Sequence, residues 1–108
     1  MRADVRAESE SSARIFRALS ISPTRVEILR QIIDQQEVST ADIMSKFGLT
    51  RNGARSHLVS LSTEGLITYR RSTHPRGSGP ITYWRPDVDE VALLLDELSL
   101  YLHLPNFR

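Results

Sequence analysis

The stretch from Ser39 to Leu61 constrains the fold of this chain more than any other part of the sequence. Ser39 and Asp42 form a capping-box pattern, which predicts that a short helix begins there. Gly48 suits the left-handed position after a helix end, and Thr50 then suits the cap of a second helix. Two helices joined by a short turn form a helix-turn-helix, whose second helix has the width to enter the major groove of DNA.

The second helix, expected over residues 51–64, is amphipathic. Apolar residues recur at helical spacing on the face that should pack inward: Ala54, Leu58 and Leu61. Four polar residues fall toward the opposite face and form the proposed base-reading set: Arg51, Asn52, Arg55 and Ser56. Arginine can read guanine and asparagine can read adenine, and each good pair is worth roughly 1–3 kcal/mol. An ordinary solvated helix face is the alternative, and the sequence does not separate base contacts from phosphate contacts.

A β-hairpin is expected after this helix. Residues 66–71 and 81–85 are rich in β-branched and aromatic side chains, and a tip rich in Pro, Gly and Ser separates them. Tyr83 and Trp84 face opposite sides of their strand, so one should pack on the core and the other could rest against a sugar-phosphate backbone. The predicted fold is therefore a winged helix-turn-helix, mainly α with a small β-hairpin (α+β), with about five helices and a two-stranded wing.

Six further residues are candidate DNA contacts around this unit: Lys46, Thr50, His57, Arg70, Arg71 and Arg76. Arg76 sits at the hairpin tip, where an arginine can enter a narrow minor groove. Arg70 and Arg71 alternate along a strand, so only one of them can face DNA. His57 is a candidate phosphate contact, although a packing or hydrogen-bonding role is the alternative.

Positive charge is concentrated in the same part of the chain. Residues 45–86 carry seven basic residues against Glu64 alone, which gives a net charge of +6. Residues 1–44 carry six arginines against seven acidic residues, a net charge of −1, and residues 87–108 carry Arg108 against five acidic residues, a net charge of −4. The turn, second helix and hairpin therefore carry the positive charge that binding to a polyanion requires.

Helices are also expected on both sides of this unit. Residues 1–10 lack periodicity and are expected to be flexible, which leaves residues 11–108 as one domain. Apolar spacing predicts a short helix over residues 11–20, and Ser22-Pro23 then opens a helix that runs to about Gln35.

The last helix, capped by Asp87 or Asp89 and running to about His103, is too apolar to have only one buried face. Its apolar surface exceeds what a monomer of 108 residues should need, and such surfaces mark interfaces. A two-fold dimer is therefore expected, with a palindromic operator whose half-sites lie about 10 bp or a multiple apart. The expected dimer-interface residues are Ile15, Phe16, Val91, Leu94, Leu95, Leu98, Tyr101 and Leu102.

The ordered set of motifs resembles the ArsR-type winged helix-turn-helix repressors. Ala18–Arg30 is similar to the opening of that family, where a helix containing Pro-Thr-Arg begins. Phe47–Thr50, Ser56–Leu58 and Glu64–Ile67 look like its turn, its recognition helix and the entry to its wing. The resemblance covers about residues 13–103 and implies a prokaryotic homodimer, held by the first and last helices, that represses a promoter.

Several classes of function are not expected. The chain has no cysteine, and Asp96 and His103 lack a further ligand to complete a metal site, so no metal or other cofactor is expected. Neither a catalytic cluster nor a phosphate-cradling loop is present, so an enzyme is not expected. No signal peptide or membrane-spanning run is seen, which favours a cytoplasmic protein.

Two functions stay open at this point. The favoured function is that of a sequence-specific regulator of transcription that binds double-stranded DNA. The alternative is a winged-helix module for protein interaction, or an architectural DNA-binding accessory, for instance of a phage or mobile element. The sequence identifies no effector ligand.

Overall fold

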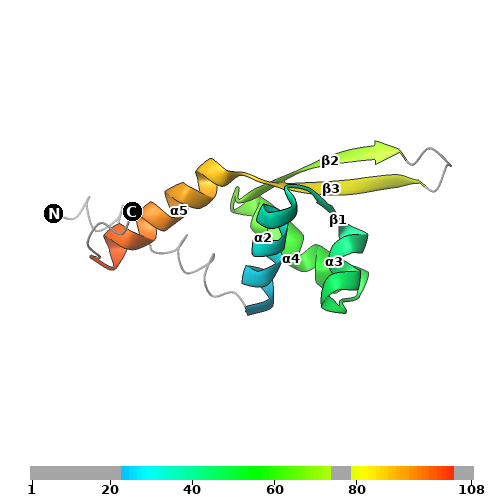
Figure 1. The fold of residues 1–108 in the computed structure, drawn as a ribbon, viewed down its shortest axis with the longest axis horizontal. Coiled ribbons are helices and arrows are strands. Elements are labelled where there is room, and N and C mark those ends of the chain that lie inside the picture. The colour runs from blue at the N-terminus through cyan, green and yellow to red at the C-terminus, as the bar shows by residue number, and fades with distance from the viewer. Residues whose placement is uncertain (1–22, 74–78, 104–108) are drawn as a thin grey trace.

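The structure, a computed structural model, describes residues 23–73 and 79–103. Four helices and a three-stranded antiparallel sheet lie within these residues (Figure 1). Their order is α2 (Pro23–Gln35), β1 (Val38–Ser39), α3 (Thr40–Phe47), α4 (Arg51–Thr63), β2 (Ile67–Thr73), β3 (Pro80–Pro86) and α5 (Val88–Tyr101). This arrangement confirms the predicted α+β winged helix-turn-helix. The segment over residues 1–22, with the expected first helix and with Ile15 and Phe16, lies outside the described residues.

The helix ends follow local signals in the sequence. The Ser39 side chain accepts a hydrogen bond from the Asp42 amide, and the Asp42 carboxylate accepts one from the Ser39 amide, which completes the predicted capping box. Gly48 ends α3 with φ of 63°, the left-handed region in which a side chain is disfavoured. Thr50 then caps α4 by accepting a hydrogen bond from the Gly53 amide at 3.1 Å. These contacts fix the turn between α3 and α4.

The sheet contains one strand more than the two-stranded wing that the sequence predicts. β2 and β3 form the expected hairpin, and β1 pairs with the other edge of β3 through Val38 opposite Trp84 and Ser39 opposite Tyr83. β1 has only two residues, too few to show the alternation that identifies a strand. Because β1 leads directly into α3, this pairing fastens the helix-turn-helix to the base of the wing.

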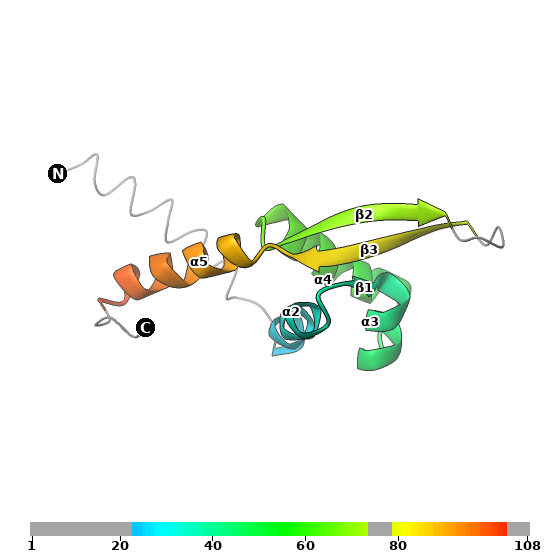
Figure 2. The same cartoon turned by 45° about the horizontal axis from the view of Figure 1, so that its top comes forward.

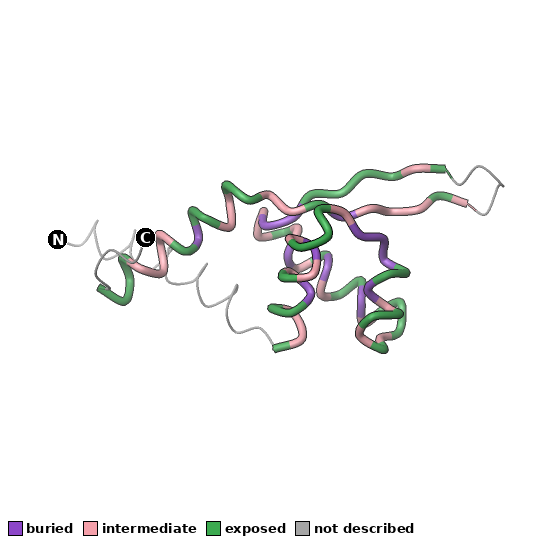
Figure 3. The backbone as a smooth tube through the Cα atoms, viewed as in Figure 1, coloured by how far each residue is buried: buried purple, intermediate pink, exposed green. Residues whose placement is uncertain are grey.

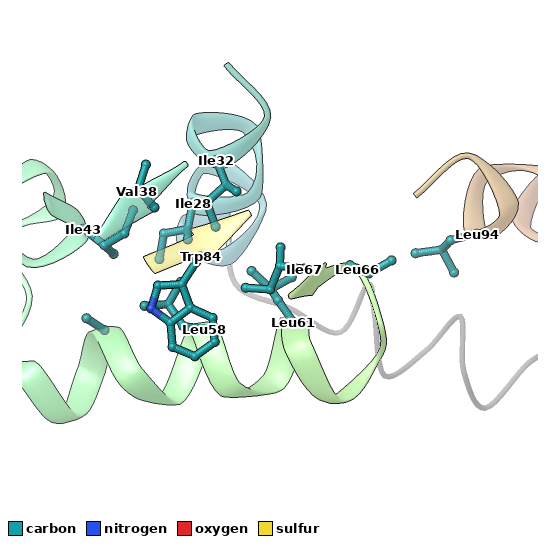
Figure 4. Close-up of a cluster of buried hydrophobic side chains, with 11 residues drawn as sticks. Ile28, Ile32, Val38, Ile43, Leu58, Leu61, Leu66, Ile67, Trp84 and Leu94 are labelled. Atoms are coloured by element: carbon teal, nitrogen blue, oxygen red, sulfur yellow. The ribbon is translucent and has the colours of Figure 1, made fainter. Parts of the chain in front are cut away.

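The core lies between α2, α3, α4 and the base of the sheet (Figure 4). Fully buried side chains come from each of these elements, among them Ile28, Ile32, Ile43, Leu58 and Ile67. Trp84 lies in the same cluster with 3% of its surface exposed, and its indole nitrogen donates a hydrogen bond to the Thr40 hydroxyl at 3.0 Å. The polar end of the largest core side chain is therefore satisfied, as a buried indole requires. Trp84 is the member of the Tyr83–Trp84 pair that packs inward.

Helix α5 projects away from this core, on the side of the molecule opposite the outer ends of β2 and β3 (Figures 1 and 2). Its predicted cap is confirmed, because the Asp87 side chain accepts a hydrogen bond from the Glu90 amide. Leu94 is its one buried residue, and Val91 and Leu98 pack partly against the core. Much of the remaining apolar surface of α5 is open to solvent, with Leu95 48% and Leu100 76% exposed (Figure 3). None of the helices in the described ranges is both long and apolar enough to span a membrane.

Candidate DNA-binding surface

Helix α4 presents one polar face to solvent. Ala54, Leu58 and Leu61 are buried, as predicted, and anchor the helix to the core. The proposed base-reading set lies on the exposed side: Arg51, Asn52, Arg55 and Ser56. The side chains with positive charge are therefore directed outward by the same helical spacing that buries the apolar ones. Among the described residues, no acidic group contacts Arg51 or Arg55.

The two faces of the wing differ in chemistry because side chains alternate along each strand. The register pairs Tyr69 with Trp84 and Arg71 with Thr82, so these four residues share one face. That face meets α4 across a groove of about 220 Å³, which we call the α4–wing groove. The groove is lined by Arg55, Val59, Ser62 and Thr63 from α4 and by Tyr69, Arg71, Thr82 and Trp84 from the wing.

Arg70 lies on the other face of the wing and is held there by Glu37 and Tyr83. Its guanidinium donates two hydrogen bonds of 2.9 Å to the Glu37 carboxylate and lies 4.5 Å from the centre of the Tyr83 ring. Arg85 also approaches Glu37, at 3.9 Å between Nε and Oε2. The hydrogen bonds from Arg70 lower the pKa of Glu37, and the charges of Arg70 and Arg85 lower it further. Arg70 is therefore held in an ion pair with Glu37, whereas Arg71 lies on the face of the wing that meets α4.

His57 is partly buried beside α2. Its Nδ1 accepts a hydrogen bond of 2.9 Å from Nε of Arg25. Burial lowers the pKa of His57, and the nearby positive charge of Arg25 lowers it further. His57 in its neutral form therefore joins α4 to α2. This contact favours a packing and hydrogen-bonding role for His57 over a contact to phosphate.

We expect this contact to make stability depend on pH. The pKa of His57 is lower in the folded protein than the 6.5 of an unperturbed histidine, so the unfolded state binds more protons below that value. The contribution of His57 to the free energy of unfolding should therefore be fully present above about pH 7 and decrease as the pH falls below 6.5. Urea titrations followed by circular dichroism at pH 7.5 and 5.5 measure the difference. His57→Gln should make the difference smaller, and an unchanged difference in His57→Gln would contradict the assignment.

The remaining predicted contacts lie at the edges of this surface. Thr50 is exposed, and while its oxygen caps α4, its hydroxyl proton stays available to a phosphate. Lys46 is exposed in the last turn of α3. Arg76 lies outside the described residues.

The sequence reasoning overlooked Tyr69. Its ring is 56% exposed, lies 5.4 Å from that of Trp84 between centroids, and borders the α4–wing groove. Tyr69 is an exposed aromatic side chain on the face of the wing that meets α4, whereas Tyr83 lies on the other face beside Arg70. The alternation of Tyr69 and Arg71 on β2 was the available signal. In the described ranges, no three side chains of His, Asp or Glu gather in a way that could hold a metal ion.

Comparisons with known proteins agree with this architecture. The chain is 25% identical to a homodimeric winged helix-turn-helix DNA-binding domain of the ArsR family from Mycobacterium bovis, with a TM-score of 0.65 over 94% of this chain and 89% of that one. It shares its fold with NolR from Sinorhizobium fredii, at 24% identity and a TM-score of 0.64 over 94% of each chain. The fold implied by the ArsR resemblance is thus confirmed.

The relationship in sequence leads to a different family name. Transcription factor E from Saccharolobus solfataricus is 27% identical over 79 residues, which are 71% of this chain and 44% of that protein. The Metallosphaera sedula protein of the same name is also 27% identical, over 71 residues. The chain thus spans less than half the length of these relatives. The family model that it matches, over residues 16–99, is that of the TFIIE alpha subunit and not an ArsR model. Since this match runs over most of the chain, the protein belongs to the TFIIE alpha subunit family.

Proposed function

We propose that this protein is a winged-helix regulator of transcription that binds double-stranded DNA with sequence preference. In this account α4 enters the major groove, and the Arg71 face of the wing follows the backbone or the minor groove. One observation carries the proposal: Arg51, Arg55 and Arg71 lie on two adjoining elements, and no acidic group of the described residues contacts them. Uncompensated guanidinium groups beside a groove attract a polyanion. The names of the relatives, regulators and transcription factors, support the same class of function.

We further propose that the protein acts as a homodimeric repressor with a palindromic operator. The exposed apolar surface of α5, which includes Leu95, Leu100 and Leu102, supports the dimer, because apolar patches on a small domain mark interfaces. The Mycobacterium bovis domain, similar over most of its length, is homodimeric. A two-fold axis places the two α4 helices in successive major grooves, so half-sites about one helical turn apart are expected.

Selection of bound sequences from a random pool of DNA duplexes tests this function. We expect enrichment of one sequence with two-fold symmetry, bound by two copies of the chain as measured by light scattering. The affinity should fall steeply as salt is raised, since each phosphate contact releases counterions. Enrichment of a half-site without symmetry would contradict the dimer, and failure to bind any duplex would contradict the proposed function.

The alternative function is that of a protein-interaction or architectural module. It is favoured by the exposed apolar surface of α5, which suits a different partner protein as well as a second copy of this chain. This function predicts DNA binding of similar strength to all duplexes in the pool, with no enriched sequence. The same selection therefore separates the two functions.

A further inference from the structure

The α4–wing groove has the size of a small recognition site. Its volume of about 220 Å³ lies below the roughly 300–1,000 Å³ of sites that enclose drug-sized molecules. It lies between α4 and the β2–β3 hairpin and is partly open to solvent. These dimensions suit a segment of polymer backbone better than a free small molecule.

The lining of the groove is selective for an anion. Arg55 lines the groove from α4 and Arg71 lines it from the wing, and no acidic residue is among the lining residues. Neither arginine has an acidic partner among the described residues, whereas Arg70, one position before Arg71, donates two hydrogen bonds to Glu37. Two like charges that converge on one groove repel each other until an anion lies between them.

The rest of the lining suits the sugars on either side of a phosphate. Ser62, Thr63 and Thr82 supply hydroxyl groups, and Val59 and Tyr69 supply exposed apolar surface, 43% and 56% exposed. Hydroxyl groups donate to phosphate oxygens, and an aromatic ring packs against a deoxyribose without reading a base. The combination matches a sugar-phosphate backbone.

The base-reading positions lie elsewhere on α4. Arg51 and Asn52 occupy the first turn of the helix, and neither they nor Ser56 line the groove. In helix-turn-helix complexes the N-terminal residues of the recognition helix contact base edges. Of the four exposed residues of the proposed base-reading set, Arg55 is therefore the one positioned to contact the DNA backbone.

We propose that Arg55 and Arg71 together hold one backbone phosphate of the DNA in the α4–wing groove. Arg55 is then a positioning residue, which sets the register of α4, while Arg51, Asn52 and Ser56 read sequence. This inference rests on the proposed function and assigns roles within it.

The test compares two duplexes of equal length and composition, the sequence selected from the random pool and a shuffled version. Arg55→Ala and Arg71→Ala should each weaken binding to both duplexes by the same factor and leave their ratio unchanged. The Arg55→Ala/Arg71→Ala double variant loses one phosphate contact, so its slope of log K against log salt should be shallower by about 0.9. At 0.1 M salt this corresponds to about an eightfold loss of affinity for DNA. Because both side chains hold one phosphate, the double loss should differ from the product of the single losses. Asn52→Ala should instead reduce the ratio between the duplexes.

Two controls accompany the variants. Arg85→Ala removes the same charge from the opposite face of the wing and should alter neither the ratio nor the slope. Arg55→Lys keeps the charge and should retain most of the slope. The inference is overturned if Arg55→Ala abolishes the preference for the selected duplex while the salt slope stays that of the wild type. In that case the proposed function stands, whereas failure of the wild-type protein to bind either duplex overturns both.

Discussion

Trp84→Ala should unfold the domain or bring it close to unfolding. The side chain is 3% exposed at the junction of β1, β3 and the helices, and large-to-small substitutions of this kind cost roughly 3–5 kcal/mol. A small domain has only about 5–15 kcal/mol of stability in total. The change also removes the donor to the Thr40 hydroxyl, which is itself buried and would be left without its partner.

Trp84→Phe separates the effect of losing apolar volume from the effect of losing the hydrogen bond to Thr40. Phenylalanine keeps much of the apolar volume and loses the hydrogen bond to Thr40, so a smaller loss, on the order of 1–2 kcal/mol, is expected. Urea denaturation followed by circular dichroism at 222 nm measures both variants against the wild type. An alanine variant within about 1 kcal/mol of the wild type would contradict the placement of Trp84 in the core.

Reversal of charge on α4 should abolish DNA binding without unfolding the protein. Arg51 and Arg55 are exposed, so replacement of both by glutamate removes no packing. If Arg51 contributes roughly 1–3 kcal/mol through a base contact and Arg55 about 1 kcal/mol through a phosphate contact, the loss of both lowers affinity by roughly 30-fold to 10³-fold. Repulsion between glutamate and phosphate increases the loss further.

A matched control is available on α2. Arg30 is exposed, with its side chain 73% accessible, and lies 4.0 Å from Glu27 on the same helix. Arg30→Glu changes the charge by the same amount per residue at a position outside the proposed surface. We expect it to change affinity only slightly, through the net charge of the protein.

The sequence predicted those parts of the fold that depend on near neighbours in the chain. The capping box of Ser39 and Asp42, the Thr50 cap and the left-handed Gly48 each involve residues within a few positions of one another. β1 was not predicted, because a strand of two residues is stabilised by its pairing with β3, more than forty residues later. Local pattern carries no information on such a contact.

In the candidate site, too, the sequence predicted the features that depend on near neighbours in the chain and not the contacts between distant residues. Helical spacing was sufficient to place Arg51, Asn52, Arg55 and Ser56 on the exposed face of α4. The alternation of Arg70 and Arg71 was also evident, but which of them faces α4 depends on how the hairpin packs and on the distant carboxylate of Glu37. His57 could not be assigned from sequence, since its partner Arg25 is 32 positions away.

The central claim is that the exposed face of α4 binds double-stranded DNA. Equilibrium titration of a labelled duplex, selected from the random pool, with wild type, Arg51→Glu/Arg55→Glu and Arg30→Glu tests it directly, with circular dichroism to verify that each variant is folded. We expect tight binding by the wild type and by Arg30→Glu, and a loss of affinity of at least roughly 30-fold in the double variant. Equal affinity of the folded double variant and the wild type would contradict it.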